Sequence, residues 1–598
     1  MQHALRVTIF SESKLGTGVP ERAPPRLPQT SSQRLWYACS IAVAGCLLRQ
    51  LASDGISQEV PEASMGTSLS RRTFVNLVGG AAALAGLSLT GCATGPEWNG
   101  TTSGVQTAGG GELTVGAAYS AKNFDPLSTS SALALSCNLN VMEGLFETDF
   151  HDFGTRPALA EGDPAQIDGT TFDVKLRSDA KFSDGREAKA SDVVFSFKVA
   201  AAAGGSYAPM LTPITSIEAK DDSTVTVRTS HPDLPWLKSR LAILKIVPEG
   251  STSEERAKAP VGTGPWMYRE VTDASVTFKP NPYYNGAYPA KDDTLRFEIL
   301  KSKVARVTAA QQGTTLISEA VPVDSIEQLR EAGLTIDAVQ GLGSRFLMFD
   351  VAKYPWSKAE VRQAIMYALD YNGMVEGALY GQASAATSLL PDDATFPHYH
   401  RASVVYSHDP DKAKSLLKGA GVTPGQLTLR TTDNDQVVAM STVIKQNLED
   451  LGFKVTIQTD SSDATYAAID TGNSNYDLLL APGDPSCFGA DPDLVLRWWY
   501  GNDVWMRTRC PWGGTVEHEE LLQEMDAALD SAGDERQEHW NRCFDILAEN
   551  VPLYPILHVR TCTASWRDTT TADGIKVSSN FRGIGTTGVA LMGVTTVK

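Results

Sequence analysis

The stretch "LTLRTTDNDQVVAMSTVIKQNLEDLGFKVTIQT", residues 427–459, decides the expected fold because it has the order strand, helix, strand. Its first five residues form an expected strand and residues 437–450 an expected helix, which Gly452 ends before the second strand. A further strand, "YDLLLAP" (476–482), follows. This order predicts an α/β unit with partly parallel strand pairing.

Short elements of the same two kinds continue along the chain. Apolar and polar residues alternate in four segments that we expect to be strands with one buried face, at 172–176, 225–227, 276–278 and 295–299. Helical spacing of apolar residues occurs in "SDVVFSFKVAAA" (191–202), "AEVRQAIMYALDYNGMVEGALYG" (359–381) and "DPDKAKSLLKGAG" (409–421). Ser191 and Asp192 are the expected start of the first helix, whereas Asp409 caps the third and Gly421 ends it.

The charge of the chain excludes one class of partner. The 598 residues carry a net charge of −18, while residues 1–92 hold 8 Lys and Arg against 5 Asp and Glu, so the remainder stands at −21. An acidic surface argues against binding to nucleic acid and against broad contact with anionic lipid. The length after residue 110 is sufficient for a large core divided into two or three lobes.

An export signal is expected at residues 65–92. Arg71 and Arg72 precede an uncharged apolar run, too short to span a bilayer, which ends in small residues before Cys92. The arginine pair resembles a twin-arginine signal, and the ending resembles a bacterial lipobox whose cysteine is lipidated.

The segments on either side of this signal are excluded from the fold. We expect Met65 to be the true start, so that residues 1–64 are a disordered, over-extended N-terminus; a genuine leader, apolar at 35–48, is the alternative. Residues 93–110 are an expected flexible tether.

Five cysteines follow Cys92. Disulfides persist outside the cytosol, and Cys487 with Cys510 is the preferred pair because the two flank an irregular, Trp-rich segment. The odd number leaves at least one thiol free, and the pairing among Cys137, Cys487, Cys510, Cys543 and Cys562 stays open.

Six stretches of sequence carry a family pattern. In chain order they are "NVMEGLFETD" (140–149), "KFSDGREAKASDVVFSFK" (181–198), "PVGTGPWMY" (260–268), "EVRQAIMYALDYNGMVEGALYGQAS" (360–384), "YSHDPDKAKSLLKGAG" (406–421) and "AENVPLYPILH" (548–558). Together they resemble the extracellular solute-binding proteins of ABC importers, family 5, of the dipeptide- and oligopeptide-binding type. Most of these residues are expected to maintain the fold, as the two glycines of "GTGPW" do where backbone segments approach closely.

The resemblance implies an α/β periplasmic binding protein of type II, with two lobes around a hinge and an extra subdomain in the first lobe. The expected lobe I core comprises residues 111–141, 257–342 and 553–598, the extra subdomain 142–256, and lobe II 343–552. It further implies a lipid-anchored receptor at the outer face of the bacterial cell membrane, in the cell envelope. This receptor would be a monomer that captures a peptide or peptide-like solute by closure and delivers it to an ABC permease.

The expected ligand site lies between the lobes. Tyr119, Ser120 and Asn123 follow the first strand, and Asp484 matches the aspartate that pairs with the α-ammonium of a peptide in relatives. A turn cap before Pro485 is the alternative role of Asp484. The loop departs from the family pattern, because "PG" replaces the usual aromatic before Asp484 and "PSCFGA" (485–490) is inserted.

A second candidate segment is "RWWYGNDVWMRTRCPWGG", residues 497–514. Trp512 and Trp498 either line a pocket or lie in the core, and Arg497 either binds a carboxylate or forms a surface ion pair. The resemblance leaves an oligosaccharide, an opine or a nickel chelate as alternative solutes.

Enzymatic function is not expected. The histidines are scattered, and neither a nucleophile elbow, a zinc helix, a phosphate loop nor any cofactor or metal motif is present in the sequence. A secreted hydrolase that uses paired carboxylates is a minority alternative, and an adhesive lipoprotein without a cleft is another.

Overall fold

The computed structural model describes residues 110–149, 152–232, 237–472, 476–501, 503–583 and 591–598. The expected signal, the lipidation site Cys92 and the tether up to residue 109 lie outside the described residues. Within the described part of the chain, no helix has the length and apolar character needed to cross a bilayer.

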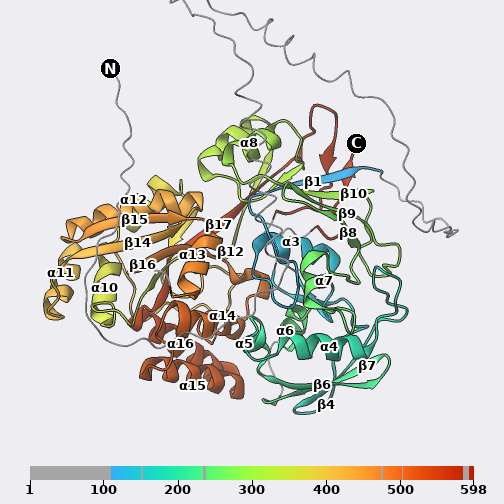
Figure 1. Ribbon diagram of the computed structural model, residues 1–598, viewed down its shortest axis with the longest axis horizontal. Coiled ribbons are helices and arrows are strands. Elements are labelled where there is room, and N and C mark those ends of the chain that lie inside the picture. The colour runs from blue at the N-terminus through green and yellow to red at the C-terminus, as the bar shows by residue number, and fades with distance from the viewer. Residues whose placement is uncertain (1–109, 150–151, 233–236, 473–475, 502, 584–590) are drawn as a thin grey trace, which may run out of the picture. The chain divides into compact units, whose positions relative to one another are not determined.

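One large sheet of 11 strands runs through the described molecule (Figure 1). Its strands, in spatial order, are β15 (Lys454–Asp460), β14 (Gln426–Thr432), β16 (Leu478–Gly483), β12 (Thr335–Phe349), β17 (Leu553–Ser565), β11 (Ile317–Ser318), β1 (Glu112–Ala117), β10 (Thr294–Ile299), β9 (Ser275–Pro280) and β8 (Trp266–Val271). A short additional strand, β13 (Ala383–Ala385), pairs with β17.

The two longest strands, β12 and β17, join the two halves of this sheet. They pair antiparallel from Thr335 opposite Ser565 to Met348 opposite Leu553, and their register is irregular between Gln340 and Ser344. On one side β12 continues to β16, and on the other β17 continues through β11 to β1. The chain therefore crosses between the halves within a single sheet.

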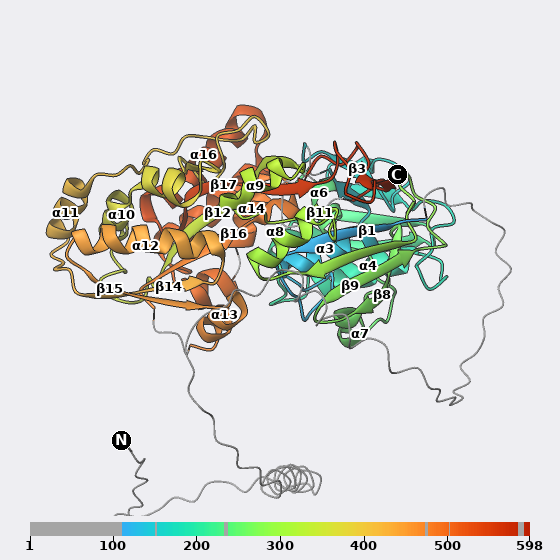
Figure 2. The same cartoon turned by 90° about the horizontal axis from the view of Figure 1, so that it is seen from above.

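The opening stretch folds as expected. Strand β14 pairs parallel with β15 and with β16, and helix α12 (Asp435–Asp450) packs on these strands (Figure 2). The Asn434 side chain caps α12 by accepting from the backbone of Gln436 and Val437. Positive φ at Gly452 then turns the chain into β15.

The other expected helices are present with small shifts. Helix α4 (Ala190–Ala200) begins one residue before Ser191, and Asp192 accepts from the backbone N–H of Lys189 at 2.7 Å. Helix α10 (Ala359–Ala368) is followed by a π-helical turn, η2 (Gly373–Ala378), because Leu369 adopts an extended conformation. Asp409 caps helix α11 (Pro410–Gly419), as predicted.

A separate sheet of four antiparallel strands lies within residues 142–256, which we call the small-sheet region. Its spatial order is β4 (Ala165–Asp168), β5 (Thr171–Lys175), β7 (Thr224–Thr229) and β6 (Ile214–Asp221). Helix α4 packs on β6 and β7, and the region also contains α5 (Ala208–Leu211) and α6 (Leu237–Ile243).

Residues 343–552, which we call the β14 region, contain most of the remaining helices. These include α13 (Ser462–Asp470), α14 (Pro492–Trp499), α15 (Val516–Asp530) and α16 (Gly533–Asn550). Helices α15 and α16 pack together, and α14 lies next to α5 of the small-sheet region (Figure 1). Outside the β14 region, the remaining helices are α3 (Ala132–Val141), α7 (Ser253–Lys258), α8 (Lys303–Gln311) and α9 (Ile326–Glu331).

Close backbone packing explains the "GTGPW" stretch. A Cβ atom at Gly262 would lie 2.1 Å from the carbonyl oxygen of Val141, and one at Gly264 would lie 2.7 Å from that oxygen. Neither position tolerates a side chain without movement of the backbone. The predicted close approach at these two glycines is therefore confirmed.

The preferred disulfide between Cys487 and Cys510 is wrong. All five cysteines of the described residues are free thiols. The Cys510 thiol is buried and donates to the carbonyl oxygen of Pro552 at 3.3 Å, whereas Cys487 lines a cavity beside Phe488. Flanking the same irregular segment does not bring the two sulfur atoms together.

Candidate ligand-binding site

Four charged side chains from separate segments act electrostatically on Tyr119. We call Tyr119, Arg306, Glu319, Arg345 and Asp484 the Tyr119 cluster. Desolvation is the largest cause that raises the pKa of Tyr119, and the charges of the other four groups act on the same phenol. The members come from the loop after β1, from α8, from the end of β11, from β12 and from the end of β16. Long-range topology, rather than any local motif, assembles this cluster.

Arg345 is a buried cation in this cluster, with 8% of its surface exposed. Its guanidinium donates to the carbonyl oxygen of Ser344 at 2.8 Å and to the side-chain oxygen of Gln436. Its Nε has no hydrogen-bond partner, and none of the ion pairs within the described ranges involves Arg345. Burial lowers its pKa and the charge of Asp484 opposes that shift. A buried guanidinium without an ion pair is costly in an isolated protein.

Arg306 lies in the same cluster and is also buried. It donates to the backbone carbonyls of Leu300 and Lys301 at 2.8 Å each, and it lies 3.7 Å from a carboxylate oxygen of Asp435. Burial lowers the pKa of Arg306, which the charges of Tyr119, Asp435 and Glu319 partly offset. The cluster thus contains two desolvated cations.

Glu319 balances these cations only in part. One carboxylate oxygen accepts from the backbone N–H of Ala118 at 3.2 Å. Burial raises the pKa of Glu319 to about 7, against the smaller lowering effects of the Ala118 hydrogen bond and Arg306. A substantial fraction of Glu319 is therefore neutral near pH 7, and the cluster has a surplus of positive charge.

Asp484 takes the turn-capping role that the sequence allowed. It caps the short 3₁₀ helix η3 (Pro485–Phe488), where one carboxylate oxygen accepts from the backbone N–H of Ser486 at 3.1 Å and from the Ser486 hydroxyl. The same carboxylate acts electrostatically on Tyr119 and Arg345. Capping fixes its position beside the cluster, and the ligand role of Asp484 stays a prediction.

Ser120 and Asn123 belong to the same loop as Tyr119. The Ser120 carbonyl accepts from the Ser131 hydroxyl at 3.4 Å. The Asn123 side chain accepts from the backbone of Asp125 at 2.9 Å and donates to the Ser128 hydroxyl at 3.3 Å. Both residues shape the loop that presents Tyr119, which retains 39% exposure.

The tryptophan candidates are placed in aromatic packing. Trp512 is only 1% exposed and packs edge-on against His518 at 5.3 Å, so it offers no face to a solute in this conformation. Trp498 packs against Phe488 at 4.9 Å. Phe488 itself lines a cavity between η3, α3 and α6. Trp512 lies in the turn at 511–514 and is buried in the core, where it packs against the following helix α15.

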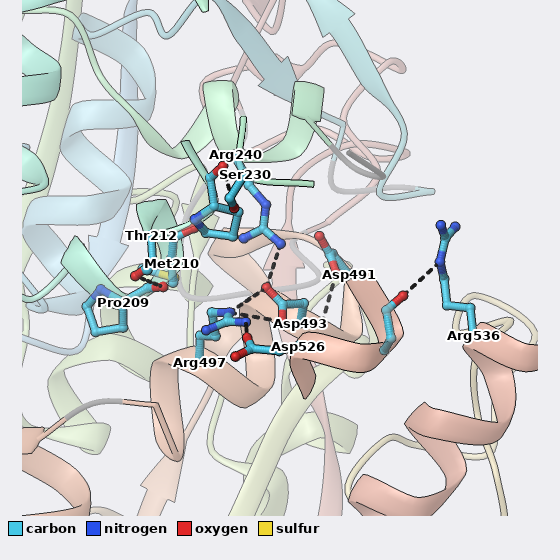
Figure 3. Close-up of polar contacts among 12 residues, drawn as sticks. Pro209, Met210, Thr212, Ser230, Arg240, Asp491, Asp493, Arg497, Asp526 and Arg536 are labelled. Carbon is cyan, nitrogen blue, oxygen red and sulfur yellow. Dashed lines mark hydrogen bonds and ion pairs between the residues drawn. The ribbon is translucent and has the colours of Figure 1, made fainter. Parts of the chain in front are cut away.

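Arg497 forms ion pairs, as the alternative for this residue anticipated, but in a buried network instead of at the surface (Figure 3). It donates to both carboxylate oxygens of Asp493 at 2.9 and 3.0 Å and to Asp526 at 2.6 Å. Arg240 of α6 reaches the same Asp493 at 2.5 Å. We call Arg240, Asp491, Asp493, Arg497 and Asp526 the Asp493 cluster.

Sequence reasoning missed Arg306, Glu319 and Arg345. The one available signal was Arg345, a charged residue at the start of the apolar strand segment "RFLMF" (345–349). Among the described residues, no group of three or more His, Cys, Asp or Glu is arranged to hold a metal ion.

Known proteins share this architecture. The single sheet that runs through both halves and the separate small sheet fit the two-lobed architecture of a type II binding protein. Residues 154–506 match the family model described as "Bacterial extracellular solute-binding proteins, family 5 Middle". The chain is a member of this family of extracellular solute-binding proteins.

Three similar proteins illustrate the relationship. A probable D,D-dipeptide-binding periplasmic protein of Escherichia coli (strain K12) is 26% identical over 362 residues, which are 58% of this chain and 68% of the relative. Di/tripeptide-binding protein 1 of Pseudomonas aeruginosa (strain UCBPP-PA14) is 26% identical over 69% of this chain and 82% of its own. The crystal structure of a dipeptide-binding protein from Pseudoalteromonas sp. SM9913 in complex with Met-Leu matches with a TM-score of 0.70, at 19% identity, over 81% of this chain and 100% of its own.

Proposed function

We propose that this protein captures a peptide or peptide-like solute between its two lobes and delivers it to the permease of an ABC importer. The observation that carries the proposal is the Tyr119 cluster, in which an anionic and two cationic side chains surround one partly exposed phenol. A peptide with free termini has one ammonium and one carboxylate. The cluster offers a group of opposite charge to each of them.

Asp484 is the proposed partner of the solute ammonium. Its carboxylate is fixed by the cap of η3 and lies close enough to Tyr119 to act on its pKa. A charge-assisted hydrogen bond between ammonium and carboxylate contributes about 1.5–3 kcal/mol. Tyr119, Ser120 and Asn123 form the loop that covers this end of the solute.

Arg345, supported by Arg306, is the proposed partner of the solute carboxylate. The planar guanidinium matches a carboxylate with two parallel hydrogen bonds. Arg345 has an Nε without a hydrogen-bond partner and takes part in no ion pair within the described ranges, so a solute carboxylate would supply a direct partner for this cation. Arg497, Trp498 and Trp512 are not part of the proposed site, since their side chains are engaged elsewhere.

Closure of two lobes is the proposed mechanism, with no covalent chemistry. The proposed first lobe comprises residues 111–141, 257–342 and 553–598 with the extra subdomain 142–256, and the second comprises residues 343–552. The crossing strands β12 and β17 are the natural hinge, since they alone extend through both halves of the sheet. The permease would recognise the closed monomer.

The proposed location is the outer face of the cell membrane, with a lipid anchor at Cys92 after twin-arginine export. The order of charged start, apolar run and small residues before Cys92 supports this. Cys92→Ala is expected to release the protein from membranes, as measured by fractionation. Retention of the variant on the membrane would contradict the anchor.

Mass spectrometry of the solute that co-purifies with the native protein tests the ligand class. A peptide with free termini is the expected result. An oligosaccharide, an opine or a metal chelate in its place would replace the peptide proposal. Conversion of the solute during incubation with the purified protein would favour a hydrolase instead.

A further inference from the structure

A fully buried ion pair joins two parts of the molecule that are far apart in sequence. Arg240 lies on α6 in the small-sheet region, Asp493 lies on α14 in the β14 region, and both side chains have 0% exposure. The guanidinium of Arg240 donates to Asp493 at 2.5 Å and to the carbonyl oxygen of Met210 at 2.7 Å. Figure 3 shows Arg240 and Arg497 approaching the Asp493 carboxylate from different elements.

Three further contacts connect the same two regions. His231 lies 2.5 Å from Asp530, at the C-terminal end of α15. The rings of Tyr207 and Phe488 meet edge-on at 6.0 Å, and those of Phe153 and Phe396 lie 5.6 Å apart. The Arg240–Asp493 ion pair is therefore the buried centre of an extended contact, which also includes the more exposed hydrogen bond between His231 and Asp530.

Arg240 has its carboxylate partner only while the two regions touch, whereas Asp493 also pairs with Arg497 of its own helix. Asp493 is the only carboxylate paired with Arg240 among the described residues, whereas Arg497 also has Asp526. Removing the Asp493 charge would leave Arg240 buried without its ion-pair partner, which strongly destabilises a buried arrangement. Separation of the regions would instead return both groups to water. The contact is thus a two-state element that favours the docked arrangement only when both charges are present.

We propose that the Asp493 cluster is a latch for the closed form, in which Arg240 is a positioning residue that sets solute affinity without touching the solute. The latch rests on the lobe closure of the proposed function. It names the contact that sets the equilibrium between the open and the closed form. Because an apparent dissociation constant scales inversely with the fraction of binding-competent protein, weakening the latch lowers affinity for every solute by the same factor.

Distance measurement between spin labels tests the latch independently of any solute. Ile167→Cys on β4 and Val516→Cys on α15 place labels at exposed sites in the two regions. We expect the full-length protein as purified to show a short distance, and Asp493→Asn to shift the distribution to longer distances. A wild-type distribution with only long distances, or an Asp493→Asn distribution equal to the wild type, would overturn the proposal.

Comparing the distance distributions of single and double variants distinguishes a latch from a simple loss of folding. Asp493→Asn leaves a charged Arg240 buried, whereas Arg240→Met replaces it with an apolar chain. The double variant Arg240→Met/Asp493→Asn is therefore expected to recover most of the short distance lost in Asp493→Asn. Asp530→Asn, at the exposed pair with His231, provides a variant that folds normally and is expected to give a smaller shift in the same direction.

Affinity provides the second measurement. With Met-Leu as the probe, Asp493→Asn is expected to weaken binding roughly 30-fold or more, and by the same factor for an amidated version of the dipeptide. Lys238→Met is the matched control, because it removes a cation from the same helix whose partner, Asp163, lies within the same region. An equal loss in the control would overturn the latch. Absence of Met-Leu binding with an intact distance shift would instead contradict only the peptide proposal.

Discussion

The two buried charge clusters of this molecule differ in one respect. In the Asp493 cluster both arginines have carboxylate partners within 3 Å. In the Tyr119 cluster, Arg345 has backbone and amide partners and takes part in none of the ion pairs of the described residues. A completed cluster can hold the protein's own parts together, whereas an incomplete one costs stability until another molecule supplies the missing charge. On the proposed function, the completed cluster serves the chain itself and the incomplete one serves a solute.

Arg345→Met is the strongest test of this difference. We expect affinity for a dipeptide with free termini to fall roughly 1,000-fold, about 4 kcal/mol, because the solute carboxylate loses its partner. The free energy of unfolding is expected to rise, because a buried charge without an ion pair is removed. Calorimetry and chemical denaturation measure the two effects. Arg507→Met, at an exposed pair with Asp503, is the matched control, and a loss of both affinity and stability would show that Arg345 is structural.

Glu319 gives the Tyr119 cluster an expected pH dependence. The folded protein keeps the Glu319 proton up to a pKa of about 7, whereas the ordinary value is 4.5. The stability from this group is therefore complete below pH 4.5 and is lost as the pH rises through 7, by about 3 kcal/mol. Denaturation of Glu319→Gln across this window is expected to show a flatter profile than the wild type. An unchanged slope would exclude a raised pKa at this carboxyl.

Asp484→Asn sharpens the ligand side of the comparison. We expect binding of a dipeptide with a free ammonium to weaken by about 2 kcal/mol, roughly 30-fold, and binding of its N-acetylated form to change little. The amide side chain can still accept the hydrogen bonds that cap η3, so the loop is retained. Isothermal titration with both dipeptides is the measurement. Equal losses for the two would assign Asp484 to the turn alone.

The smallest effect is expected at the surface of α6. Lys238 pairs with Asp163 at 3.1 Å, with 40% and 72% of the side chains exposed. Lys238→Met should change the free energy of unfolding by less than about 0.5 kcal/mol, because exposed ion pairs contribute little. Loss of the ion pair of Arg240, two residues away, is expected to change the free energy of unfolding far more. If thermal melts show that Lys238→Met destabilises the protein as much as Asp493→Asn does, the expected difference between buried and exposed ion pairs is wrong.

Local pattern predicted most of the fold but little of the cluster around Tyr119. The strand–helix–strand order at 427–459, the cap at Asp409 and the close approach at Gly262 depend on neighbouring residues, and each is confirmed. Arg306, Glu319 and Arg345 come together only through pairings between distant segments, so no spacing in the sequence could reveal them. Trp512 shows the converse, since an aromatic residue in a Trp-rich segment has the same pattern in a core as in a cleft.

The irregular pairing between Gln340 and Ser344 has an evolutionary consequence. Side chains alternate between the two faces of a strand, so a change of one residue in the length of this segment would move Arg345 to the opposite face of the sheet. Such a change requires no substitution among the residues around Tyr119. A lineage that inherits this architecture can therefore acquire a different solute preference through a single codon gained or lost beside the crossing strands.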